Sequence, residues 1–209
     1  VLTMSKQLTD EWGIGRQTAI NMTDQMAEIS RTIGIGVELS ADLVGMFHKF
    51  HGMSLETSEA FIKQGAWLAH MNNVAPDAVM RDIAGSADLV ATYTKGGAEN
   101  IFKMAIEAKK LGMEMSDLDQ IARGLLDIDS SLSAEMEFMA LTGKQMNLDR
   151  ARHLALDEEW GLLNEELTRQ FGDQAYWQNA TRIEKELMAD ILQTDIKTMA
   201  KIVKGEEDR

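Results

Sequence analysis

The 209-residue sequence contains no cysteine and only one proline, Pro76. Without cysteine the chain can form no disulfide, has no thiolate nucleophile and offers no sulfur ligand to zinc. This composition fits a protein made in a reducing cytosol. Because proline is the strongest helix breaker, its scarcity leaves long stretches of chain free to form helices.

Basic residues are also scarce, and long apolar runs are missing. The chain has 21 Lys and Arg against 34 Asp and Glu, a net charge of −13 that would repel a phosphate backbone, so we expect no direct nucleic-acid binding. No stretch approaches the roughly 18 to 20 apolar residues of a membrane span, and no signal peptide opens the chain. We therefore expect no stable membrane span. Because the sequence begins at Val1 rather than methionine, we expect it to belong to a longer polypeptide.

The residues that are abundant favour helices. Ala, Leu, Met, Glu, Gln and Lys lose little rotamer freedom in a helix, and 44% hydrophobic content is enough to form a core. Glycine stops recur just before capping residues, as in Gly52 before Ser54 and Gly143 before Asn147. The sequence predicts an all-α fold, a compact array of about eight to ten short helices joined by tight glycine-capped turns, with no sheet.

Apolar spacing and capping signals predict the individual helices. They are expected near 16–32, from an N-cap at Ser40 to Gly52, from Ser54 to Asn72–Asn73, from Pro76 to a bend at Gly85–Ser86 and on to Gly96–Gly97, at 98–111, 116–141, 148–156 and 160–172, and in two closing segments around 183–192 and 196–203. Segment 116–141 begins with a capping box at Ser116–Asp119 and can bend near Ser130–Ser131. It carries one apolar stripe, made of Ile121, Leu125, Ile128, Leu132, Met136 and Met139.

These elements suggest three parts. Residues 1–33 form an N-terminal helical segment that can link to sequence outside this chain, residues 34–205 form a helical domain, and residues 206–209 form a frayed acidic tail. We find no fixed period that would indicate a solenoid.

The histidines are the first candidates for chemistry. His48 and His51 are three residues apart on one expected helix and can face the same way, but no Cys, HExxH or Glu-x-x-His pattern accompanies them. We interpret them as amphipathic surface residues beside a glycine stop. His70 and His153 are isolated and lack a Ser or Cys nucleophile motif. The sequence therefore predicts neither a metal site nor a hydrolytic triad.

Acidic runs and glycine pairs have equally plain interpretations. The runs at 157–159 and 165–166 could supply paired carboxylates for glycoside cleavage, but charge runs on helices are usually solvated faces. The pairs Gly13/Gly15 and Gly34/Gly36 lack a third glycine or a Gly-Lys-Ser/Thr, so we read them as helix breaks rather than nucleotide loops. We predict no catalytic, cofactor-binding or metal-binding residue, and no cofactor.

Methionine and tryptophan could instead serve partners. The 15 methionines could form an adaptable binding surface, although at these spacings we expect most to fill the core. The four tryptophans do not alternate with basic residues, so we expect packing anchors rather than a base-stacking platform; they are Trp12, Trp67, Trp160 and Trp177.

Several segments resemble tail tape-measure proteins of contractile-tailed bacteriophages. They are KKLGMEMSDL at 109–118, IDSS at 128–131 and LTGKQMNLDRAR at 141–152, with GMS at 52–54, NVAP at 73–76 and the closing helix pair. The likeness covers roughly 34–203 and consists of packing and turn patterns, so it transfers no functional residue. The run DEEWG at 157–161 departs from it, since a shorter turn marked by Gly or Asp is expected there.

The resemblance implies a structural virion protein without an active site. Such a protein occupies the lumen of the tail tube, helps to set tube length and takes part in genome ejection. Its many glycine stops suggest a folded end domain that docks in the tube and at the baseplate hub as a homo-oligomer about the tail axis, while the ruler lies in sequence outside this chain. The alternatives are a peptidoglycan-degrading tail module, for which no Glu-Ser signature or metal-binding set is present, and a helical adaptor outside any virus.

Overall fold

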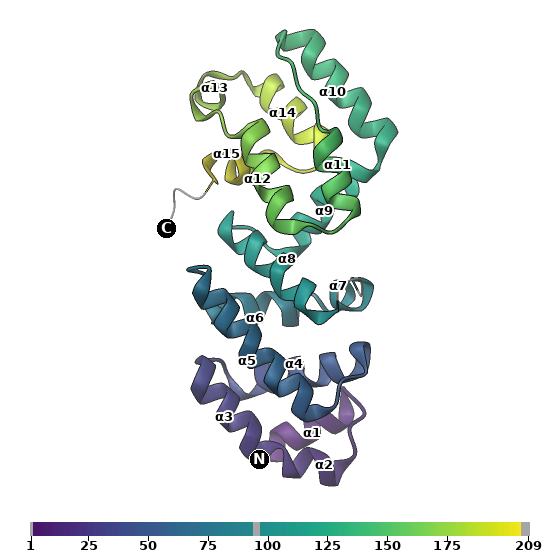
Figure 1. Ribbon diagram of the computed structural model, residues 1–209, viewed down its shortest axis with the longest axis vertical. Coiled ribbons are helices and arrows are strands. Elements are labelled where there is room, and N and C mark those ends of the chain that lie inside the picture. The colour runs from purple at the N-terminus through teal and green to yellow at the C-terminus, as the bar shows by residue number, and fades with distance from the viewer. Residues whose placement is uncertain (1, 94–96, 206–209) are drawn as a thin grey trace. The chain divides into compact units, whose positions relative to one another are not determined.

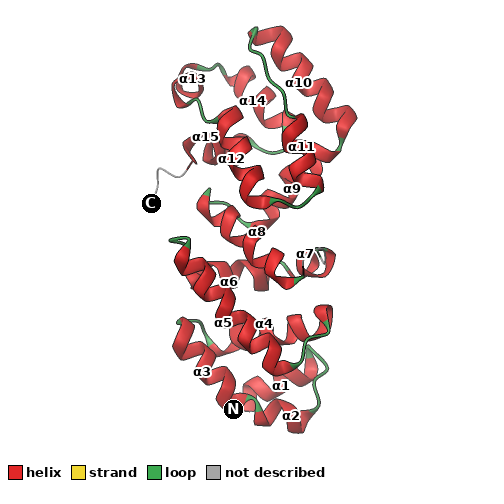
Figure 2. Ribbon diagram, viewed as in Figure 1, coloured by secondary structure: helices red, strands yellow, loops and turns green. Residues whose placement is uncertain are grey.

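The computed structural model describes residues 2–93 and 97–205, and these residues form helices and loops without a strand (Figures 1 and 2). The prediction of an all-α fold is therefore confirmed. The described helices number 15, more than the eight to ten expected: α1 Leu2–Asp10, α2 Arg16–Asn21, α3 Thr23–Ile33, α4 Val37–His51, α5 Leu55–Met71, α6 Pro76–Gly85, α7 Ala87–Thr92, α8 Ala98–Lys110, α9 Met115–Leu126, α10 Ile128–Thr142, α11 Asp149–Leu156, α12 Trp160–Phe171, α13 Gln174–Asn179, α14 Arg182–Ile191 and α15 Ile196–Lys204. Gly96 and the expected frayed tail at 206–209 lie outside the described residues.

Most of the expected helix ends lie where local chemistry placed them. Gly34, Gly52 and Gly143 end α3, α4 and α10 with φ of 78°, 63° and 70°, a left-handed conformation that a residue without a Cβ adopts at little cost. Ser54 caps α5 by accepting a 3.1 Å hydrogen bond from the Thr57 amide. Pro76 is the first residue of α6. These signals act within a few residues of each other, which is why the sequence reveals them.

Three expected caps are wrong. Ser40 lies inside α4, whose N-cap is Gly36, four residues earlier, and its hydroxyl donates to the Gly36 carbonyl at 3.2 Å. The capping box of α9 begins at Glu114 rather than at Ser116, and the Asp117 carboxylate accepts from the Glu114 amide at 3.1 Å. The N-cap of α11 is Leu148 rather than Asn147.

Unexpected breaks account for much of the larger helix count. The segment predicted as one helix near 16–32 is two helices, α2 and α3, separated at Met22. The segment predicted as 116–141 is divided at Asp127 into α9 and α10, because the Asp127 backbone has φ −77° and ψ 77°, outside the helical region. Helix α1 lies in the expected N-terminal helical segment but was not predicted individually, and α13 was not expected.

The chain divides into two compact units, residues 1–106 and residues 107–209. In unit 1, α4 contacts α1, α3, α5, α6 and α7 and is the central helix. The N-terminal segment 1–33 belongs to this unit, where α1 and α3 pack against α4. The division at 106/107 lies within α8 and was not predicted.

In unit 2, α9 to α15 pack around a second apolar core. Contacts join α10 to α9 and α14, α11 to α9 and α12, and α15 to α12, α13 and α14. Fully buried side chains in this core include Leu118, Ile121, Leu125, Leu163 and Ile202. The acidic runs and the buried polar groups described below lie on the helices of this unit, whereas His48 and His51 lie on α4 of unit 1.

Candidate functional site

The two neighbouring histidines of α4 are engaged by separate main-chain carbonyls. His48 Nδ1 lies 2.7 Å from the Met53 carbonyl oxygen, and His51 Nε2 lies 3.2 Å from that of Val90. Because a carbonyl only accepts, each of these ring nitrogens carries the proton. The imidazoles thus tie the end of α4 to the following loop and to α7. His70 and His153 are exposed, and the described residues contain no group of three or more His, Asp or Glu placed to hold a metal ion.

The acidic runs do not form a carboxylate pair. Glu165 is exposed whereas Glu166 is buried, so these two side chains lie on different faces of α12. Residues 157–159 form the turn between α11 and α12, in which Glu158 has φ 59°. Glu158 therefore has a left-handed conformation, which favours glycine, in the segment where the tape-measure resemblance implied a shorter turn marked by Gly or Asp.

The structure also shows where the glycine pairs and the tryptophans lie. Gly15 and Gly36 precede α2 and α4, so both pairs mark helix boundaries as interpreted. Trp160 is buried, and half-buried Trp12 donates from Nε1 to Asp42 Oδ1 at 3.2 Å. Trp67 corrects the expectation of packing anchors, because it is 61% exposed on α5.

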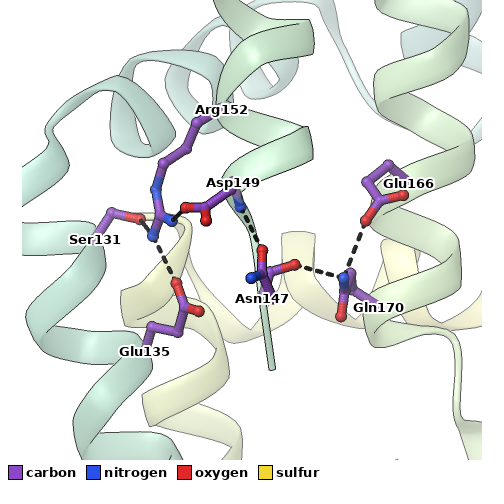
Figure 3. Close-up of polar contacts among 7 residues, drawn as sticks. All are labelled: Ser131, Glu135, Asn147, Asp149, Arg152, Glu166 and Gln170. Atoms are coloured by element: carbon purple, nitrogen blue, oxygen red, sulfur yellow. Dashed lines mark hydrogen bonds and ion pairs between the residues drawn. The ribbon is translucent and has the colours of Figure 1, made fainter. Parts of the chain in front are cut away.

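A buried ionic cluster joins α10 to α11 (Figure 3). From α11, Arg152 Nη2 donates to Glu135 Oε2 at 2.6 Å and to Ser131 Oγ at 3.0 Å, and Nη1 donates to Asp149 Oδ1 at 3.0 Å. The side chains of Arg152 and Glu135 are only 8% and 6% exposed. Sequence analysis missed this cluster; its signal is the spacing of Ser131 and Glu135, four residues apart on one helical face.

The loop between α10 and α11 is held from the other side by α12 (Figure 3). Gln170 Nε2 donates to the Asn147 carbonyl at 2.6 Å and to Glu166 Oε1 at 3.0 Å. Asn147 Oδ1 accepts from the Asp149 amide at 2.9 Å, but Asn147 lies one residue before the N-cap of α11, which is Leu148. A side chain of α12 and a side chain within the loop thus order this segment.

The electrostatics of these groups favour a structural role. Hydrogen bonds from Arg169 and Gln170, together with the charges of Arg169 and Arg150, hold the pKa of Glu166 below its ordinary value despite burial. Glu166 is therefore ionised at neutral pH and has no proton to donate as a general acid. The Arg152 guanidinium is paired with two carboxylates, the buried one of Glu135 and the exposed one of Asp149.

The ionic cluster lies along the buried side of α10. Ser131 and Glu135 point toward Arg152 (Figure 3). An adjacent stripe of the helix carries Ile128, Leu132 and Met136, which are 48%, 44% and 60% exposed. We call these three residues the α10 apolar face. The sequence analysis placed them in one core stripe with Ile121 and Leu125, which are buried. That expectation is wrong because the break at Asp127 changes the direction of the helix and of its faces.

A smaller exposed patch lies in unit 1. Trp67 and Met71, four residues apart on α5, are 61% and 60% exposed. Met71 and Met136 are exposed, whereas many other methionines fill the core, as expected for most of them.

The chain matches no family model, no curated protein and no solved structure. Within the described part of the chain, no helix combines the length and apolar character needed to cross a bilayer. The functional argument accordingly depends on the residues themselves.

Proposed function

We propose that this chain is a folded helical segment of a tail tape-measure protein of a contractile-tailed bacteriophage. The parent polypeptide helps to set tube length, and this segment docks in the tail tube and at the baseplate hub and takes part in genome ejection. The observation that supports the proposal is the tape-measure resemblance of 109–118, 128–131 and 141–152. These stretches form helix ends, the turn at Gly112 and the loop at Gly143, so the likeness lies in the framework of unit 2.

The chemistry of the candidate site supports work by contact rather than catalysis. The central charges of the buried cluster are paired with one another, and Glu166 is held ionised. The large side chains left exposed on α5 and α10 are apolar, as at many protein interfaces. Such surfaces fit tube and hub proteins as partners, with the segment arranged as a homo-oligomer about the tail axis.

The acidic charge is compatible with a position in the tube lumen. A net charge of −13 repels the phosphate backbone, so DNA can pass the protein without binding it. The length role belongs to the parent chain, in which a continuous helix rises about 1.5 Å per residue and converts chain length into tube length.

Mass spectrometry of purified virions tests the proposal, and we expect peptides of this chain in tail fractions. Internal deletions in the parent polypeptide should shorten the tail in proportion to the residues removed, as measured by electron microscopy. Particles that lack the polypeptide but have normal tails would refute the proposal. Clearing of a cell-wall suspension by the isolated chain would support the peptidoglycan-degrading alternative instead.

A further inference from the structure

Helix α10 buries two polar side chains and exposes three large apolar ones. Its inward side carries buried Ser131 and Glu135, whose polar atoms bond to Arg152, together with Phe138. Its outward side carries the α10 apolar face, with residues at four-residue intervals along one stripe. A solvated helix normally has the opposite arrangement, so the outward stripe has the pattern of a surface that meets another helix.

The charged residues of the segment that carries this stripe are all acidic. Residues 127–143 contain no Lys, Arg or His, and Asp127, Asp129 and Glu137 are exposed on or beside α10. Asp127 accepts from Gln193 Nε2 at 2.9 Å, and this hydrogen bond is the main reason that its pKa lies below the ordinary value. The stripe is thus bordered by exposed carboxylates.

The cations nearest in sequence and on the packed helix α14 already have acidic or aromatic neighbours. Arg123 forms an ion pair with Asp119 at 2.8 Å, and Lys144 lies 3.2 Å from the centre of the Tyr176 ring. On α14, Arg182 pairs with Glu186 at 2.7 Å and Lys185 lies over Trp177. None of these groups neutralises the carboxylates that border the stripe.

A second copy of the chain is a poor occupant of this face. Two copies would bring their carboxylates together, and each chain has a net charge of −13. Three half-exposed side chains also offer an apolar area on the order of a few hundred Å², below the roughly 800 Å² per partner of a standard stable interface. The area instead suits one helix lying against another.

We propose that the α10 apolar face binds a cationic amphipathic helix of a partner protein. The partner places aliphatic side chains against Ile128, Leu132 and Met136, and Lys or Arg beside Asp129 and Glu137. This inference concerns a surface of unit 2 and does not rest on the virion assignment, because it follows from burial and charge alone.

Fluorescence anisotropy with the full chain and a labelled synthetic helix of leucine and lysine, similar in length to α10, tests the inference. We expect the double variant Leu132→Gln/Met136→Gln to weaken binding by about tenfold or more, because two apolar contacts are lost. The variant Asp129→Asn/Glu137→Gln should also weaken binding and reduce its dependence on salt. Amide shifts in NMR spectra should concentrate at 128–140.

The matched control is Leu156→Gln/Leu162→Gln, which changes two exposed leucines on α11 and α12 of the same unit. Its affinity should stay within about twofold of wild type, since these positions lie outside the α10 apolar face. Circular dichroism and urea unfolding establish that each variant is folded. Equal loss in the control, or equal binding of a leucine and glutamate peptide, would overturn the inference. A concentration-dependent dimer abolished by Leu132→Gln/Met136→Gln would also overturn it, by identifying a second copy as the occupant.

Discussion

The two units contain different kinds of core. In unit 1, the rings of Phe47, Phe61 and Phe102 lie with centroids 5.2 to 5.7 Å apart, and Phe102 packs directly against the backbone of Gly65. In unit 2, Arg152 and Glu135 form an ion pair among buried residues. The aromatic core depends on volume and shape, whereas the ionic core depends on every charge having a partner. We therefore expect unit 1 to be destabilised mainly by changes of side-chain volume, and unit 2 by the loss of a charged partner.

The largest expected effect is the loss of one charge from unit 2. Arg152→Leu leaves Glu135 buried without its cation and should lower the free energy of unfolding by about 3–5 kcal/mol. Urea denaturation followed by circular dichroism measures the change. The matched control Arg150→Leu removes a 63% exposed side chain and should cost less than about 1 kcal/mol.

Removing both Arg152 and Glu135 tests whether the loss of stability comes from the unpaired charge. Arg152→Leu/Glu135→Leu should recover most of the stability lost by Arg152→Leu, because no charge remains buried. Arg152 Nε is buried and has no hydrogen-bond partner among the described residues, so the native pair already includes one uncompensated group. A double variant no more stable than Arg152→Leu would show that the cluster is not governed by charge pairing.

In unit 1, the test of the core is a substitution that adds one carbon atom next to the aromatic rings. Gly65→Ala would overlap the ring of Phe102, which is 1% exposed and held by two other rings, and should cost about 1–3 kcal/mol through overpacking. Gly85→Ala is the control, since no atom lies near the added carbon at this exposed helical position, and it should stabilise by about 0.5–1 kcal/mol. Equal effects of the two substitutions on thermal unfolding would contradict the tight packing of Phe102 against Gly65.

A smaller effect concerns the turn between α11 and α12 in unit 2. Glu158 has φ 59°, which is strained for a residue with a Cβ, so Glu158→Gly should stabilise by about 0.5–1 kcal/mol. Glu159→Gly, at a neighbouring residue with φ −86°, should give no gain. Stability to urea distinguishes the two, and a loss in Glu158→Gly would mean that its side-chain interactions outweigh the backbone strain.

Acid should affect unit 2 first. The pKa of Glu166 is lowered chiefly by Arg169, so its contribution is present above the unfolded-state pKa of about 4.3 and is lost as pH falls through the folded-state value. Hydrogen exchange as pH is lowered below about 5 should show earlier loss of protection in α12 than in α4. Glu166→Gln should reduce the pH dependence of stability in this range, whereas Glu165→Gln, at an exposed position, should leave it unchanged.

Local signals were predictable wherever cause and effect lie close in sequence. Gly143 and Ser54 lie where the sequence analysis put them, because a left-handed stop or a cap involves only nearby backbone groups. The break at Asp127 was not predictable in the same way. Its carboxylate accepts from Gln193, which lies 66 residues away, so the conformation is stabilised by tertiary packing.

The candidate site shows the same limit. Arg152 is separated from Glu135 by 17 residues, including a non-helical loop, so their pairing depends on how α10 and α11 meet. Glu135 is buried whereas Leu132 and Met136 are exposed, although hydrophobicity alone suggested the reverse. Which stripe of α10 is buried depends on how the helix packs against α9, α11 and α14.

The sequence by itself determined that this protein is helical, acidic and free of cysteine chemistry, and it determined many of the places where helices stop. Those properties follow from residue propensities and from contacts within one turn of the chain. Tertiary structure decided the division into two units, the ionic core of the second and the direction of each apolar stripe. These features depend on contacts between distant residues, and short-range periodicity carries no information about which distant groups will meet.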